Sequence, residues 1–179
     1  VSAGGTLVPA SADDDAAVSV TLPSAWASTV YGTAVTSLSA STNGALSVNG
    51  AAATAFTNAT LPAAFNSGNP TLFPYWDDID MRPGTTTDGG IFTETTGSAP
   101  NRTFKVEWRG RHFVSGQAVG PVDTNFAILL HENSDVFEFV YPMTGVTSFA
   151  GGASATVGVQ SSNTGTGFTQ FSFNTASLT

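Results

Sequence analysis

The chain has 179 residues, of which only 10 % are charged, and its formal net charge is −8. Lys and Arg together number five, so a basic surface that follows nucleic-acid phosphates is excluded, and we expect no nucleic-acid partner. Hydrophobic residues make up 41 %, which excludes a disordered chain, and the absence of cysteine excludes disulfides and thiolate metal sites. No apolar run approaches the roughly 20 residues that span a bilayer, so we expect no membrane insertion.

Apolar and polar residues alternate through much of the chain, as they do in strands with one buried face. In chain order, the predicted strands lie at residues 16–22, 103–108, 126–130, 137–141, 155–159 and 171–173. Turn-forming sequences such as Asn43-Gly44, Asn49-Gly50 and Asn133-Ser134 separate apolar segments. Two short segments, 23–29 and 62–65, have weak helical character, and neither is long enough to form a packing helix. These features predict an all-β fold, an antiparallel β-sandwich with little helix, with a closed barrel as the alternative.

The N-terminal residues 1–12 differ from the rest of the chain. They contain small residues, two glycines and the short apolar stretch Thr6-Leu7-Val8. We expect them to form an arm that precedes a single sandwich domain at residues 13–179. The arm is either an edge strand of its own sheet or a strand that joins the sheet of a neighbouring copy. In the second case, Leu7 or Val8 sets the register by entering an apolar slot on the neighbour.

Several short motifs follow one another in an order typical of one family. They are Asp13-Asp14-Asp15, Phe73-Pro74-Tyr75-Trp76-Asp77-Asp78-Ile79-Asp80, the strand sequences at 99–108 and 125–132, and the C-terminal sequences at 154–160 and 170–175. This order resembles the β domain of many secreted bacterial and archaeal surface proteins. It is also similar to the extracellular nidogen-type domain, with which it shares the aromatic-Trp-x-Asp-x-Asp stretch. The resemblance covers residues 13–175 and implies a nidogen-like or jelly-roll-like sandwich.

The resemblance also implies a role. Such domains are non-enzymatic modules of matrices, adhesins and cell-surface assemblies, and the family has no shared catalytic or binding residues to transfer to this chain. We therefore expect a secreted, extracellular or cell-surface structural protein. We expect it to form homo-oligomers or filaments with copies of itself by strand addition. The alternative is a carbohydrate-binding or adhesive module that contacts surface glycans or matrix.

A cluster of acidic residues is the strongest candidate for a metal site. Asp77, Asp78 and Asp80 lie close together, and Asp88 follows eight residues after Asp80. Carboxylates on one side of an extended segment, with a turn carbonyl, are suitable ligands for calcium, which takes six to eight oxygens. We expect no cofactor other than this calcium ion. The alternative is that these carboxylates accept backbone N–H groups and end the strand. The Asp13–Asp15 run is interpreted as a solvated entry to a strand.

Aromatic residues offer a candidate glycan platform. Tyr75 and Trp76 are neighbours on opposite faces of an extended segment, so one of the two rings is expected to be exposed. Trp108 shares the face of Phe104 and Val106 and is expected in the core.

Catalysis is not expected. The chain has no Gly-x-Ser-x-Gly nucleophile motif, and its carboxylates do not form a recognisable acid–base pair. Glu107, Glu132 and Glu138 alternate with large apolar residues and are expected on outer sheet faces.

Two sequences match the N-glycosylation acceptor pattern, in which asparagine is followed by any residue but proline and then by Ser or Thr. They are Asn58-Ala59-Thr60 and Asn101-Arg102-Thr103. In a Thr-rich chain such matches arise readily, and they matter only in a host that modifies exported proteins.

Overall fold

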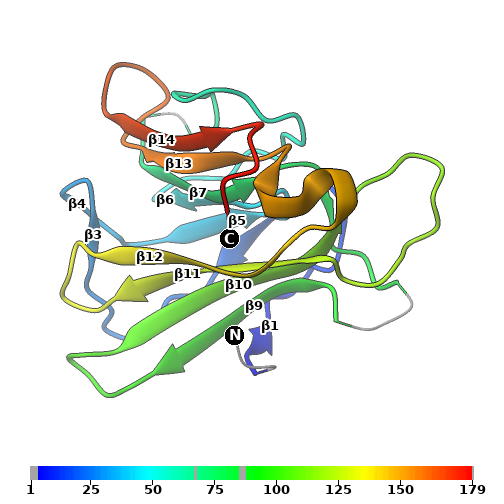
Figure 1. The fold of residues 1–179 in the computed structure, drawn as a ribbon. Coiled ribbons are helices and arrows are strands. Elements are labelled where there is room, and N and C mark those ends of the chain that lie inside the picture. The colour runs from blue at the N-terminus through cyan, green and yellow to red at the C-terminus, as the bar shows by residue number, and fades with distance from the viewer. Residues whose placement is uncertain (1–3, 67, 85–87, 179) are drawn as a thin grey trace.

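The computed structural model describes residues 4–66, 68–84 and 88–178, and within them it is an all-β sandwich of two antiparallel sheets (Figure 1). The first sheet has the order β1-β9-β10-β11-β12, and β8 also pairs with β10. Its strands are β1 (Thr6–Leu7), β8 (Ile79–Asp80), β9 (Gly90–Thr96), β10 (Thr103–His112), β11 (Thr124–His131) and β12 (Phe137–Thr144). Because β9 to β12 are consecutive in the chain, they form a meander.

The second sheet combines strands from both halves of the chain, in the order β14-β13-β7-β6-β5-β2. Its strands are β2 (Ala17–Val20), β5 (Leu38–Ser41), β6 (Ala45–Val48), β7 (Thr71–Trp76), β13 (Thr156–Gln160) and β14 (Phe168–Phe173). A separate two-stranded ribbon is formed by β3 (Thr29–Val30) and β4 (Thr33–Ala34). The two open sheets confirm the predicted sandwich over the barrel alternative.

Helical structure is sparse, as the sequence predicts. Within the described residues, the helical segment is the 3₁₀ turn η1 (Thr147–Gly152), which the sequence analysis did not predict. Neither segment with weak helical character, 23–29 or 62–65, forms a helix. No described helix has the length and apolar character needed to cross a membrane.

The core lies between the inner faces of the two sheets. Trp108 is fully buried there, as predicted, and its indole N–H donates to the Ser41 carbonyl of the opposite sheet at 2.8 Å. Its ring stacks on Phe126 at 5.3 Å between centroids, and Phe126 stacks in turn on Tyr75 at 5.2 Å. This aromatic stack joins β10 and β11 of the first sheet to β7 of the second. The buried indole thereby has both apolar contacts and a hydrogen-bond partner.

A second apolar cluster lies on the outer face of the second sheet. There the loop at residues 50–66 covers β6 and β7, so that every residue of these two strands is buried. Phe65 of the loop contacts both Phe73 and Trp76 edge-on, each at 5.2 Å between centroids. The strand β7 is therefore buried on both faces, which explains its nearly continuous apolar sequence.

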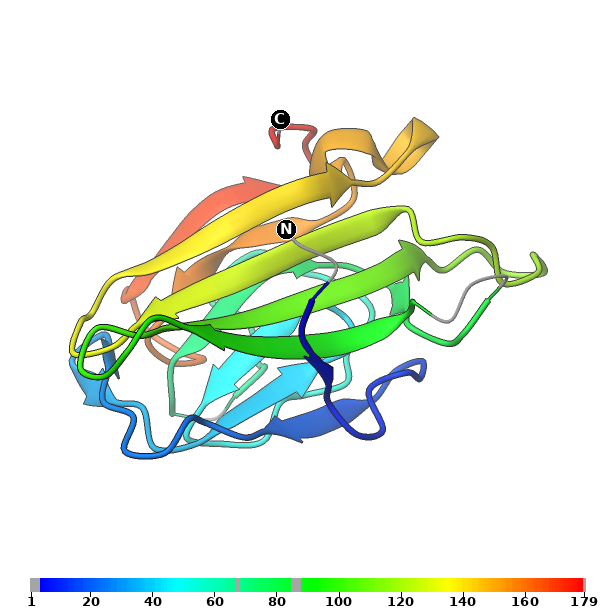
Figure 2. The ribbon, with the colours of Figure 1, turned by 90° about the horizontal axis from the view of Figure 1, so that it is seen from below.

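The N-terminal arm packs against its own domain. Thr6 and Leu7 pair with Thr93 and Phe92 of β9, and the chain then continues to β2 in the second sheet (Figure 2). Val8 is buried in the main core, whereas Leu7 is 44 % exposed. This arrangement is the first of the two alternatives for the arm, an edge strand of its own sheet. Residues 1–3 of the arm lie outside the described residues.

Candidate functional site

The acidic motif lies where the chain passes from one sheet to the other. The strand β7 belongs to the second sheet, and β8, after only two intervening residues, pairs with β10 of the first. The crossing is fixed by the β5–β6 turn, because the side-chain oxygen of Asn43 accepts the Ile79 N–H at 2.9 Å. Gly44 completes this turn at a φ of +76°. A Cβ there would lie 1.8 Å from the Tyr75 carbonyl oxygen, so only glycine fits.

Asp78 meets two acidic residues from the start of the chain. Carboxylate oxygens of Asp14, Asp15 and Asp78 all lie within 4.8 Å of one another. Burial raises the pKa of Asp78 to about 6, and the neighbouring charges of Asp15 and Asp14 add to the effect. The rings of Phe56 and Phe113 line the same small pocket and are 49 % and 38 % exposed. Three carboxylates are only part of the oxygen set that calcium takes, and calcium binding stays a prediction.

The structure does not bring the other three residues of the predicted calcium set into this cluster. Asp80 accepts hydrogen bonds from the Arg82 backbone and guanidinium at 2.8 to 2.9 Å. Burial alone would raise the pKa of Asp80, but these bonds outweigh it and lower the pKa. Asp77 faces His112 and Ser154, and Asp88 is exposed. The alternative role, accepting hydrogen bonds at a strand end, describes Asp77 and Asp80 well.

A buried histidine joins the two sheets beside this crossing. The ring of His112, at the end of β10, stacks on Phe149 of η1 at 4.1 Å between centroids. Its Nε2 lies 3.0 Å from the Tyr75 hydroxyl and its Nδ1 lies 3.2 Å from Asp123. Burial alone would lower the pKa of His112, but hydrogen bonds to Asp123 and Asp77 outweigh it and raise the pKa. Nothing in the sequence near His112 indicated these partners, which come from distant segments.

The proposed glycan platform is absent from the surface. Tyr75 is fully buried in the main core, and Trp76 is 3 % exposed beneath the loop at 50–66. The indole N–H of Trp76 donates to the Ala55 carbonyl at 2.7 Å. The expectation that one of the two rings is exposed is therefore wrong. Alternation places the rings on opposite faces correctly, but both faces of β7 are covered.

The outer face of the first sheet carries a row of ion pairs. Glu107 lies on that face as expected, yet it is 1 % exposed because Lys105 and Arg109 flank it at 3.1 and 2.9 Å. Asn125 adds a hydrogen bond at 2.9 Å. Burial alone would raise the pKa of Glu107, but these partners outweigh it and lower the pKa. A carboxylate held ionised in this way is poorly suited to act as a general acid.

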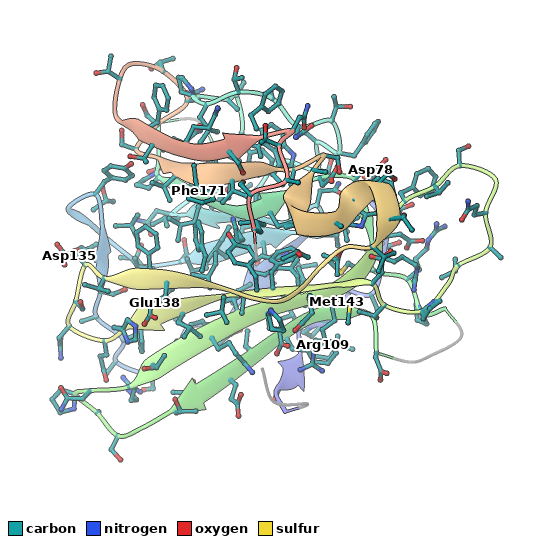
Figure 3. All side chains as sticks on the ribbon, viewed as in Figure 1. Asp78, Arg109, Asp135, Glu138, Met143 and Phe171 are labelled. Atoms are coloured by element: carbon teal, nitrogen blue, oxygen red, sulfur yellow. The ribbon has the colours of Figure 1, made fainter. Side chains whose placement is uncertain are left out.

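An apolar groove lies between the β12 edge of one sheet and the β13–β14 end of the other. It has a volume of about 530 Å³. Aromatic and aliphatic side chains line most of it: Phe137, Phe139, Tyr141, Val159, Phe171 and Leu178. Phe171, on the edge strand β14, is 64 % exposed (Figure 3). The sequence predicted these aromatic residues as strand residues, but it could not show that two sheet edges leave them open to solvent.

Comparison with known proteins gives one finding. A family model described as NIDO related matches residues 1–179. No curated protein and no solved structure matches the chain significantly.

Proposed function

Because the chain belongs to the NIDO-related family, we propose that it is a non-catalytic, extracellular structural domain. In this proposal, copies of the domain assemble at the cell surface or in a filament by strand addition. The extracellular location rests on the general character of the family. The absence of catalysis rests on the ion-paired state of Asp80 and Glu107 and on the lack of a nucleophile motif or recognisable acid–base pair in the sequence.

The observation that carries the assembly proposal is the open edge of β12. This strand has eight residues and pairs with β11 on one side, whereas no described strand covers its other side. An uncovered edge presents N–H and C=O groups that another strand can pair with. The apolar groove runs beside the same edge, so an added strand would gain both backbone hydrogen bonds and side-chain contacts.

The distribution of charge favours a second copy as the occupant. A chain with a net charge of −8 repels itself, so contact between copies is least opposed at surfaces that lack carboxylates. The arm at residues 4–12 has no charged residue, and neither has the lining of the groove. The two surfaces are therefore matched in being neutral and apolar on an otherwise acidic molecule.

The positions of the two surfaces favour an open assembly. The arm strand β1 lies at one edge of the first sheet and β12 lies at the other. β1 can keep its pairing with β9 and offer its free side to β12 of the next copy. Contact between two different surfaces repeats from copy to copy, and it produces an open filament unless it closes into a ring.

Sedimentation velocity over a range of concentrations tests this proposal. The unmodified protein should form a series of oligomers, and Leu7→Asp or Phe171→Asp should reduce the association constant by about tenfold or more, because each places a charge in the apolar contact. Phe56→Asp is the control and should associate normally, because Phe56 lies outside both surfaces and is 49 % exposed, close to the 44 % of Leu7.

Mixing the two variants gives the decisive result. Leu7→Asp retains an intact groove and Phe171→Asp retains an intact arm, so an equimolar mixture should form dimers that do not extend. A protein that stays monomeric at millimolar concentration, or a mixture that stays monomeric, contradicts strand addition between arm and groove.

A further inference from the structure

The structure separates the two N-glycosylation sequences, which look equivalent in the sequence. Asn58 lies in the loop at 50–66 and is partly buried, whereas Asn101 is exposed in the turn between β9 and β10. We infer that Asn101 is the residue at which the folded domain carries an N-linked sugar, and that Asn58 carries none. This inference rests on the proposed extracellular role, because only an exported chain meets the transferring enzyme.

The hydrogen bonds of the Asn58 side chain exclude it as an acceptor of the sugar. Its side-chain nitrogen Nδ2 donates to the Ser154 carbonyl at 2.7 Å and to the Asn174 side-chain oxygen at 2.8 Å, and it lies 3.1 Å from the Thr156 hydroxyl. Both N–H groups of this amide are therefore in use, and they connect the loop to β13 and to the segment after β14. A sugar on Nδ2 would remove one N–H and insert a bulky group between these segments. Modification at Asn58 and the native packing of the loop exclude each other.

Asn101 has the opposite environment. Its backbone N–H closes the turn by donating to the Ser98 carbonyl at 2.9 Å, and its side chain has no hydrogen-bond partner among the described residues. Every residue from 95 to 101 is exposed. A sugar attached to Nδ2 of Asn101 would displace no hydrogen bond of that side chain to the described residues, because the side chain makes none.

The residues around Asn101 hold the turn in place without involving that side chain. Arg102 pairs with Glu132, with its Nε 2.8 Å from the carboxylate, and Asn133 donates to the Pro100 carbonyl at 3.0 Å. The two hairpin turns of the first sheet are thus joined at this end. A sugar on Asn101 would therefore be attached to a turn that these contacts hold in place.

The position of Asn101 also keeps a sugar away from the candidate site. β10 begins at Thr103 and ends at His112, and ten residues of strand extend about 30 Å. Asp78, beside the far end of β10, and Asp135, beside the near end, lie at opposite ends of the molecule (Figure 3). A sugar on Asn101 would enlarge the polar surface of the near end and leave the acidic cluster uncovered.

The chemistry requires one co-reactant, a sugar carried on a lipid diphosphate. The transfer forms a bond between the anomeric carbon of the sugar and Nδ2 of Asn101. It breaks the bond from that carbon to the diphosphate, which leaves with its electron pair, and Nδ2 loses one proton. Thr103, in the third position of the pattern, supplies the hydroxyl that such sequences require.

The test is secretion of the full chain from a host with an N-linked oligosaccharyltransferase, followed by intact mass measurement and peptide mapping of the folded fraction. A reporter with a known acceptor site, secreted in the same cells, confirms that the enzyme is active. We expect sugar at Asn101, with occupancy at Asn58 at least tenfold lower. Asn101→Gln should remove the added mass, whereas Thr60→Ala, which destroys the other sequence but keeps Asn58 and its hydrogen bonds, should leave it unchanged.

Either of two results would overturn the inference: sugar at Asn58 in the folded fraction, or a bare Asn101 while the reporter is modified. Because the host imposes export, a bare Asn101 reports on the acceptor alone and not on where the protein works. Unmodified protein from a bacterial cytoplasm, used for the sedimentation experiment above, tests the assembly proposal separately.

Discussion

At the scale of single residues, His112 is a buried titratable group whose pKa depends on several neighbouring side chains. It is buried between two carboxylates, Asp77 and Asp123, and contacts Tyr75, whose own pKa is raised by burial. The charged imidazolium suits this position better than the neutral ring. The pKa of His112 lies above its ordinary value of 6.5 in the folded state, so its stabilising effect is complete below about pH 6.5. That effect is lost as the pH rises through the folded-state pKa.

We therefore predict that His112→Gln lowers the free energy of unfolding by about 1 to 3 kcal/mol at pH 6, since it removes the cationic partner of the buried Asp77 and the partly buried Asp123. The loss should be smaller at pH 9 than at pH 6, because the stabilising effect of the imidazolium falls as the pH rises through its folded-state pKa. Urea unfolding at the two pH values measures both quantities. His131→Gln, at a half-exposed histidine paired with Glu138, serves as the control. An equal loss at both pH values would show that the ring acts by packing alone.

The ionised form of the Asp78 side chain is disfavoured in the folded protein. Its pKa of about 6 in the folded state exceeds the ordinary 3.8, so its favourable contribution is present below about pH 4 and is lost as the pH rises through 6. Asp78→Asn removes the repulsion from Asp14 and Asp15. We expect a gain of about 1 kcal/mol in the free energy of unfolding at pH 7.5, reduced from the full shift by solvent screening, and no gain at pH 4.

The same variant tests whether Asp14, Asp15 and Asp78 bind calcium. Thermal unfolding of the native chain and of Asp78→Asn is compared in a chelator and in millimolar calcium. A ligand that binds the folded state raises its melting temperature by mass action. If calcium raises the melting temperature of the native chain and Asp78→Asn abolishes that rise, the three carboxylates hold the cation. An equal melting temperature in chelator and in calcium contradicts a calcium site at this cluster.

These residue-level features were only partly predictable. The sequence predicted Asp78 as a metal ligand from its neighbours in the chain, but the carboxylates that lie beside it, Asp14 and Asp15, come from the N-terminal part of the chain. Carboxylates from connecting segments far apart in the chain meet only through the way the strands pair, and composition does not encode that pairing. The partners of His112 were missed for the same reason.

At the scale of secondary-structure elements, the central strand β7 depends on the loop at 50–66. Phe65 packs over Phe73 and Trp76, and it is the largest of the loop side chains in the second apolar cluster. We predict that Phe65→Ala lowers the free energy of unfolding by about 3 kcal/mol through loss of burial and a cavity. It should also increase quenching of Trp76 fluorescence by acrylamide. Phe56→Ala, at a half-exposed position in the same loop, should cost under about 0.5 kcal/mol.

Equal destabilisation by the two variants would mean that the loop packs differently from the arrangement described. Quenching is read against Trp76→Phe, because Trp26 and Trp108 also fluoresce.

Alternation predicted the strands well where one face is apolar and the other is polar. β10 and β11 follow it closely, with Val106 and Ile128 facing the core and Glu107 facing outward. It failed for β7, where a loop distant from the strand's own neighbours covers the second face. Periodicity reports which residues share a face, but exposure depends on what else packs there. The correct parity of Tyr75 and Trp76, together with their unexpected burial, illustrates that difference.

At the scale of the whole molecule, net charge opposes the assembly that the open edges favour. Raising the ionic strength from about 10 mM to 150 mM shortens the screening length from about 30 to 8 Å. We predict that this change strengthens association, since it weakens repulsion between acidic bodies and leaves a neutral, apolar contact unaffected. Light scattering at a fixed protein concentration measures the change. Dissociation on adding salt would show that ion pairs hold the copies together.

The second sheet pairs strands from the two ends of the chain, and this affects how the chain folds. β9 to β12 are successive hairpins, so they can pair within residues 90–144 while later residues are still being made. β7 must wait for β13, whose register joins Thr71 to Gln160. Pairing over such separations is slow, because a long loop must close before any contact stabilises it. Until the last strands emerge, β7 is an uncovered aromatic edge, so a chain interrupted before residue 156 should aggregate instead of folding.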